Sequence, residues 1–103
     1  MINYGKQTLK DNDFKAVIKT LRSDFLTSGP NVDKFEKNLI KKFGGKFCSV
    51  VNNGTSALNI VGKALGWKKN DKIITTPLSF LATANCIVNN NAIPVFSDVE
   101  NES

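Results

Sequence analysis

Apolar side chains recur at helical spacing in two stretches near the amino terminus, residues 11–24 and 32–43. Spacings of three and four positions place such side chains on one face, so each stretch predicts an amphipathic helix. Asp11 or Asn12 is a suitable cap for the first helix, Pro30 suits a turn or a first helical position, and Gly44–Gly45 suits a helix end. The apolar positions are Phe14, Val17, Ile18 and Leu21 in the first stretch and Phe35, Leu39, Ile40 and Phe43 in the second.

Three short apolar runs follow, at residues 47–51 (FCSVV), 73–76 (IITT) and 92–99 (AIPVFSDV). Continuous runs of this length predict buried strands. Residues 55–66 and 79–90 lie between the runs and have helical character, with Ser79 as a candidate cap of the later helix. Strands that alternate with helices predict an α/β fold with a parallel-rich sheet covered by helices on both faces.

The length of 103 residues suggests a single segment, with two helices in residues 1–45 and a strand-helix-strand-helix-strand order in residues 46–99. Three parallel strands make a poor complete sheet, because both faces of such a sheet need covering. We therefore expect the chain to be the opening portion of a larger α/β domain, with an open parallel edge.

The composition of the chain argues against several classes of function. The chain has no apolar run long enough to cross a membrane and no signal-peptide pattern, so a cytoplasmic protein without a membrane partner is expected. The net charge of +5 comes from scattered lysines with a single arginine, in a chain also rich in asparagine. Because such a composition also arises from an AT-rich genome, no nucleic-acid partner is expected. With no histidine and no CxxC pair, no metal site is expected, and Cys48 and Cys86 are expected to be free thiols.

The stretch Asn52–Asn53–Gly54–Thr55–Ser56 joins the first predicted strand directly to a predicted helix. The first turn of a helix has unpaired amide groups and a partial positive charge, and glycine lets an anion approach the backbone. Thr55 and Ser56 add hydroxyl donors, so the joint predicts a phosphate site. The alternative is an ordinary helix cap, for which Ser and Thr are also common. The stretch is neither a P-loop nor a GxGxxG motif.

A second candidate site is TTPLSFLATAN, residues 75–85, at the carboxyl end of the next predicted strand. Phe80 falls on the turn into a helix and could stack on a flat ligand ring, although a core position is the alternative. Thr83 could reach the same crevice or bond back to its own helix. The polar segment LTSGP, residues 26–30, could be a connector or the lip of a pocket.

Taken together, these stretches resemble the sugar aminotransferases of the DegT/DnrJ/EryC1/StrS family, pyridoxal-phosphate enzymes with fold type I. The resemblance covers most of residues 26–99, and IITTPLSFLATAN is similar to the branch that aminates a UDP-linked 4-keto-6-deoxy sugar toward pseudaminic acid. It implies a homodimeric enzyme, pyridoxal 5'-phosphate as cofactor, a nucleotide-sugar substrate and glutamate as amino donor.

The resemblance also implies roles for residues. Gly54, Thr55 and Ser56 would hold the cofactor phosphate, and Phe80 would stack on its ring. Thr27 would lie in a segment near the nucleotide-sugar pocket. Thr83, from its place one turn beyond Phe80, is a second candidate contact to the substrate. None of the lysines matches the family's Schiff-base lysine, so no catalytic residue is expected in this chain, and the fragment alone is expected to be inactive. The alternatives are a dehydratase or regulatory protein of the same fold, a stand-alone α/β phosphate-binding module, and an RNA-binding fragment.

Overall fold

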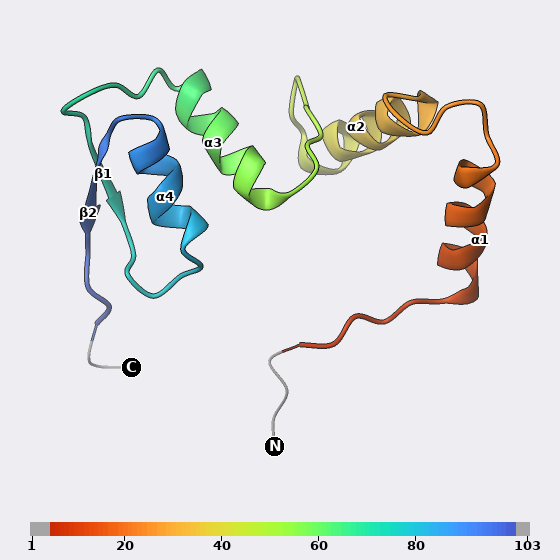
Figure 1. Ribbon diagram of the computed structural model, residues 1–103, viewed down its shortest axis with the longest axis horizontal. Coiled ribbons are helices and arrows are strands. Elements are labelled where there is room, and N and C mark those ends of the chain that lie inside the picture. The colour runs from red at the N-terminus through yellow and green to blue at the C-terminus, as the bar shows by residue number, and fades with distance from the viewer. Residues whose placement is uncertain (1–4, 101–103) are drawn as a thin grey trace. The chain divides into compact units, whose positions relative to one another are not determined.

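The computed structural model describes residues 5–100 of the chain (Figure 1). The chain divides into two compact units, residues 1–49 and residues 50–103. The first unit contains the helices α1 (Asp11–Leu21) and α2 (Pro30–Phe43). The second contains α3 (Gly54–Ala64), β1 (Lys72–Thr75), α4 (Ala82–Asn89) and β2 (Ile93–Phe96).

Local signals explain where the helices of the first unit begin and end. Lys10 is the N-cap of α1, and its backbone amide donates to the Asp13 carboxylate at 2.8 Å. The expected caps, Asp11 and Asn12, are therefore wrong: Asp13 reaches back to the preceding residue, so the helix already includes them. Pro30 is the first residue of α2, and Gly44 ends it with a φ of 72°, a left-handed conformation that glycine adopts without strain.

The connection between α1 and α2 is a tight turn. Ser28 has a φ of 46°, and Gly29 is buried directly before α2. A β-carbon added at Gly29 would come within 2.7 Å of the Phe25 β-carbon, so the turn closes against Phe25 only because residue 29 lacks a side chain. The segment LTSGP is thus the connector between the two helices.

The second unit contains the parallel sheet. β1 and β2 pair in parallel, with Lys72 opposite Ile93 and Thr75 opposite Phe96. α4 lies beside the strand pair in Figure 1 and packs against both strands, while α3 packs against α4. The core consists of Cys86, Ile87 and Ala92, with Trp67 and Ile73 packed against it. The predicted α/β class with a parallel sheet and helices is confirmed.

Two details of the second unit differ from expectation. Residues 47–51 form no strand, and the sheet among the described residues has two strands, β1 and β2. An apolar run becomes a strand only through pairing with a neighbour, and β1 and β2 pair with each other. The prediction that Ser79 caps α4 is also wrong: Leu81 is the N-cap, and the Ser79 hydroxyl pairs with that of Thr83 instead.

The contact between α3 and α4 depends on one glycine and one buried amide. A β-carbon at Gly62 would lie 2.5 Å from Nδ2 of Asn90 and 2.7 Å from the Trp67 ring, so only glycine allows this approach. Asn90 Nδ2 donates to the backbone carbonyls of Cys86 at 2.7 Å and Asn59 at 3.2 Å. These bonds tie the two helices together and satisfy a polar group in the core.

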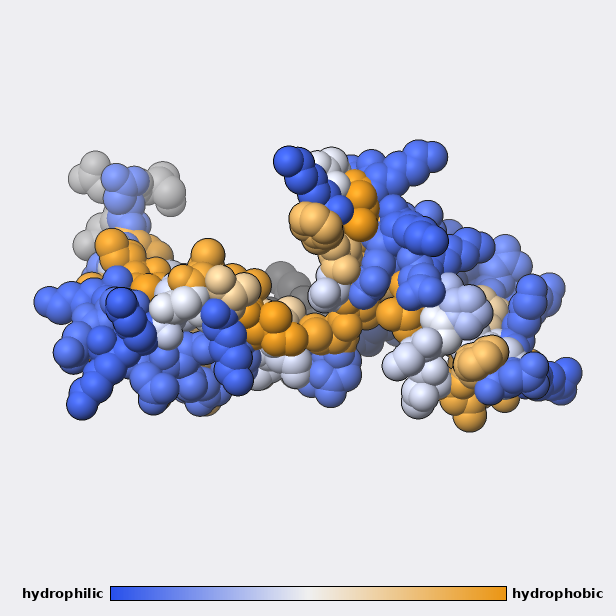
Figure 2. Space-filling model, turned by 90° about the horizontal axis from the view of Figure 1, so that it is seen from above, coloured by the Kyte–Doolittle hydropathy of each residue, from blue (hydrophilic) through white to orange (hydrophobic). Residues whose placement is uncertain are grey.

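Apolar side chains also remain at the surface, as the orange side chains in Figure 2 show. In α1 the whole apolar stripe is exposed, including Phe14 at 52% and Leu21 at 64%. Both cysteines are free, as expected, with Cys86 buried and Cys48 half-buried. Among residues 5–100, no helix combines the length and apolar character needed to cross a bilayer.

Candidate functional site

The candidate site begins at the first turn of α3. Asn53 is the N-cap, with an extended backbone, and its side-chain oxygen accepts a hydrogen bond from the Ser56 amide at 2.8 Å. The helix starts at Gly54 itself, so Gly54 and Thr55 occupy its first two positions. Amides at these positions have no partner within the helix ladder. They are therefore the donors that this turn can offer to a ligand, while the Ser56 amide is already used.

The capping role of Asn53 was not among the predictions, which named Ser and Thr as the common cap residues. Asn53 has φ −162° and ψ 166°, the ordinary extended geometry of a cap residue. The signal was present in the sequence, because asparagine directly before a helix and three residues before Ser56 is a strong N-cap pattern.

A cavity of about 490 Å³ brings this turn together with the start of α4. Four of the predicted site residues line it: Gly54, Thr55, Phe80 and Thr83. Its remaining lining is apolar and consists of Ala57, Leu58 and Ala82. A β-carbon built at Gly54 would meet no atom within 4 Å, so the backbone there is open to a ligand.

Two predicted site residues are not among the lining of this cavity. Ser56 is half-buried, and its amide is held by Asn53. Thr27 belongs to the other unit, where it is exposed in the turn between α1 and α2. The roles predicted for these two residues in binding phosphate and nucleotide sugar stay predictions.

Phe80 is exposed and does not belong to the core. The residue is 78% exposed in the segment between β1 and α4, so the alternative that it packs in the core is wrong. An exposed aromatic ring at the rim of a cavity can stack on a flat ligand. Thr83 lines the cavity, as one of its two expectations had it, and its hydroxyl pairs at 2.9 Å with that of Ser79, which precedes α4, rather than with a group of its own helix.

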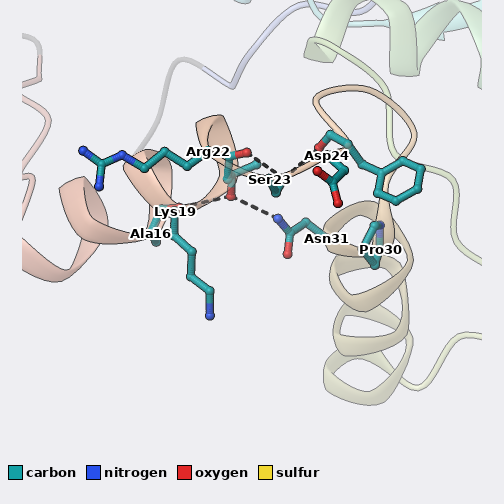
Figure 3. A pocket seen from close by; sticks show the side chains of 9 residues that line it. Ala16, Lys19, Arg22, Ser23, Asp24, Pro30 and Asn31 are labelled. Carbon is teal, nitrogen blue, oxygen red and sulfur yellow. Dashed lines mark hydrogen bonds between the residues drawn. The ribbon is translucent and has the colours of Figure 1, made fainter.

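A second cavity, of about 450 Å³, lies in the first unit beside the turn after α1 (Figure 3). Three of its polar residues bond to one another: Asn31 Nδ2 donates to the Thr20 hydroxyl at 3.0 Å, and the Ser23 hydroxyl donates to the Thr20 carbonyl at 2.7 Å. The side chain of Arg22 extends away from Asn31 in Figure 3. These bonds stabilise the turn, and Thr27 is not among the residues that line this cavity.

The cavity between α3 and α4 therefore has a defined chemical character. The first turn of α3 supplies two backbone amides, the Thr55 side chain and the positive end of a helix dipole, which together favour an anion such as phosphate. Phe80 and the apolar lining favour a planar ring. Its lining contains neither a lysine nor a carboxylate. The arrangement can bind and orient a ring that carries an anionic group, but its lining supplies no acid or base with which to react.

Comparisons with known proteins identify the family and the fold of the chain. A UDP-4-amino-4,6-dideoxy-N-acetyl-beta-L-altrosamine transaminase of Campylobacter jejuni is 40% identical over 102 residues, covering 99% of this chain and 27% of the relative. The structure of Helicobacter pylori PseC, an aminotransferase involved in the biosynthesis of pseudoaminic acid, matches with a TM-score of 0.88 at 37% identity, covering 96% of this chain and 27% of that one.

A third match is an E. coli GDP-4-keto-6-deoxy-D-mannose-3-dehydratase with bound hydrated PLP, with a TM-score of 0.85 at 30% identity over 97% of this chain and 28% of that one. The chain thus spans about a quarter of the length of these relatives. The sequence model of the DegT/DnrJ/EryC1/StrS aminotransferase family matches residues 7–103. A match over nearly the whole chain leaves no ambiguity of family: this chain belongs to the DegT/DnrJ/EryC1/StrS aminotransferases.

Proposed function

We propose that residues 1–103 are the N-terminal segment of the major domain of a pyridoxal-phosphate-dependent nucleotide-sugar aminotransferase. The cavity that joins the first turn of α3 to Phe80 carries this proposal, because it suits a planar ring with a phosphate tail. Membership of the aminotransferase family supports it. The reaction would transfer an amino group, with glutamate as donor, to C4 of a UDP-4-keto-6-deoxy sugar in the biosynthesis of pseudaminic acid or a related cell-surface sugar. The Campylobacter jejuni transaminase supports this choice of substrate.

The described residues fit pyridoxal phosphate. When bound, this cofactor acts as an electron sink for the carbon that gains or loses nitrogen. The amides of Gly54 and Thr55 and the Thr55 hydroxyl would bind its phosphate, with Ser56 completing the first turn. Phe80 would cover one face of the ring and exclude water from it. Thr83 would contact the sugar substrate. A contact of Thr27 with the nucleotide sugar is proposed from the family resemblance alone.

The proton transfers of the reaction would depend on residues outside positions 1–103. A base at the reacting carbon needs to lie within hydrogen-bond reach, and the lining of the cavity holds no titratable side chain. In this proposal the full-length protein is a cytoplasmic homodimer, and the 103-residue chain alone does not transaminate.

Replacing Thr55 by valine in the full-length protein is expected to weaken pyridoxal phosphate binding by about 1–3 kcal/mol, because valine keeps the shape but removes a hydroxyl that bonds an anion. Equilibrium titration that follows the cofactor's absorbance measures the change. Thr55→Ser is the matched control and should bind nearly as the parent does. Equal affinities for the valine and serine variants would contradict a phosphate-binding hydroxyl.

Replacing Phe80 by alanine is expected to weaken cofactor retention by about 0.5–1.5 kcal/mol, the usual contribution of one aromatic stacking contact. Dialysis of the loaded protein, followed by measurement of the residual cofactor, tests this. Phe80→Tyr keeps the ring and should retain cofactor. If Phe80→Leu retained it equally well, simple apolar cover rather than stacking would explain the role of this residue.

A dehydratase of the same fold is the second candidate, favoured by the match to the E. coli 3-dehydratase. The cavity suits both reactions, because cofactor binding is common to them. Incubation of the full-length protein with a UDP-4-keto-6-deoxy sugar and glutamate distinguishes them: an amino sugar and 2-oxoglutarate support transamination, whereas a deoxygenated keto sugar supports dehydration.

A further inference from the structure

The exposed ring of Phe80 raises the question of what holds it in place. With 78% of the residue exposed, packing in the core cannot fix the direction of its side chain. The flanking residues Leu78 and Leu81 are also exposed, at 79% and 67%. The backbone of residues 79–81 sets the direction of the bond from the Phe80 α-carbon to its β-carbon, so the placement of the ring depends on the hydrogen bonds that fix this backbone.

Thr83 makes two hydrogen bonds that reach back to this segment. Its backbone amide donates to the carbonyl of Phe80 at 2.9 Å. Its hydroxyl lies 2.9 Å from the hydroxyl of Ser79, and either oxygen could be the donor. Thr83 thus fixes residue 80 directly and residue 79 through its side chain, at the point where the chain turns into α4.

The two hydroxyl groups contain two protons, and their mutual hydrogen bond uses one. The other proton remains free to be donated elsewhere, so the pair keeps one donor beside the cavity that Thr83 and Phe80 line. A local hydroxyl pair of this kind can hold a turn without burying a charge.

We propose that the Ser79–Thr83 hydroxyl pair positions Phe80 at the rim of the cavity. Ser79 is then a positioning residue, although it does not line the cavity. Thr83 positions the ring of Phe80 in addition to any contact that it makes with substrate. The consequence for cofactor binding rests on the proposed function. The effect on the placement of the Phe80 ring does not rest on the proposed function, because the hydroxyl pair and the ring both belong to this chain and need no ligand.

The test uses the full-length protein with 4-fluorophenylalanine at position 80 and no cofactor. Fluorine NMR then reports the environment of the ring. Ser79→Ala and Thr83→Val each remove one hydroxyl, and Thr83→Val keeps the backbone bond to Phe80. Each should shift or broaden the fluorine resonance, and the double variant should change it no more than either single variant, because both break the same bond. Thr83→Ser should restore the parent resonance.

A resonance that Thr83→Val leaves unchanged would overturn the proposal, as would a double variant whose change equals the sum of the two single changes. Titration with pyridoxal 5'-phosphate adds a second readout, in which both single variants should lose about two- to tenfold in affinity, the equivalent of about one hydrogen bond. If the fluorine resonance responds and the affinity does not, Ser79 and Thr83 still position the ring, and the stacking role in the proposed function fails instead.

Discussion

Replacing Ile87 by alanine is expected to lower the free energy of unfolding of the second unit by about 2–5 kcal/mol. Ile87 is 2% exposed and lies at the centre of the small core that also contains Cys86 and Ala92. Removing its branched side chain loses apolar burial and leaves a cavity, and so small a core has few other side chains that could fill the space.

Native-state hydrogen exchange in the full-length protein measures this effect locally. The Ala92 amide donates to the Ile87 carbonyl at 3.0 Å, and the Ile93 amide donates to the Asp71 carbonyl at 2.8 Å, so both amides report on the second unit. Val88→Ala is the matched control: Val88 follows Ile87 in α4 but is 55% exposed, so its loss should change protection little. Similar loss of protection in both variants would show that Ile87 is not a core residue.

Replacing Gly62 by valine is expected to cost about 3 kcal/mol or more. The first carbon of the new side chain alone would lie 2.5 Å from Asn90 Nδ2 and 2.7 Å from the Trp67 ring. Overpacking costs about 1–3 kcal/mol, and displacing the Asn90 side chain would add the loss of its bonds to Cys86 and Asn59.

Thermal unfolding of the full-length Gly62→Val protein, together with hydrogen exchange of the α4 amides, measures this loss of stability. Lys63→Val introduces the same side chain at the next position of α3, where the residue is exposed, and should cost only about 0.5 kcal/mol through helix propensity. Because α3 and α4 both line the cavity, Gly62→Val should also weaken cofactor binding, whereas Lys63→Val should not. A Gly62→Val protein as stable as its Lys63→Val counterpart would refute the close helix approach.

Much of the fold could be predicted from periodicity, because the apolar side chains of the helices and of β1 and β2 follow local spacing rules. The run at residues 47–51 shows the limit of this reasoning. Its composition favours a strand, but a strand also needs a partner, and whether a partner exists is not a local property of the sequence. The caps of helices were missed where a neighbouring side chain decided them, as when the bond from the Lys10 amide to Asp13 made Lys10 the N-cap of α1.

The candidate site was predictable in position but not in detail. Gly54, Thr55, Phe80 and Thr83 could be named because the helix starts and the end of β1 are readable, and the structure places all four around one cavity. The exposure of Phe80 was not readable, since an aromatic residue in an apolar context fits core and surface equally. The use of the Ser56 amide by Asn53 was readable from the N-cap pattern, whereas the Ser79–Thr83 pair depends on side-chain geometry that spacing does not encode.

Cys86 has a consequence for how this region could be studied in solution. Its sulfur is buried beside Ile87 and donates to the Thr83 carbonyl at 3.1 Å, whereas Cys48 is half-buried in the other unit. A thiol-modifying reagent should therefore label Cys48 readily and reach Cys86 only when α4 detaches from the strands. The labelling rate of Cys86 thus measures how often the segment that presents Phe80 opens transiently, without any introduced probe.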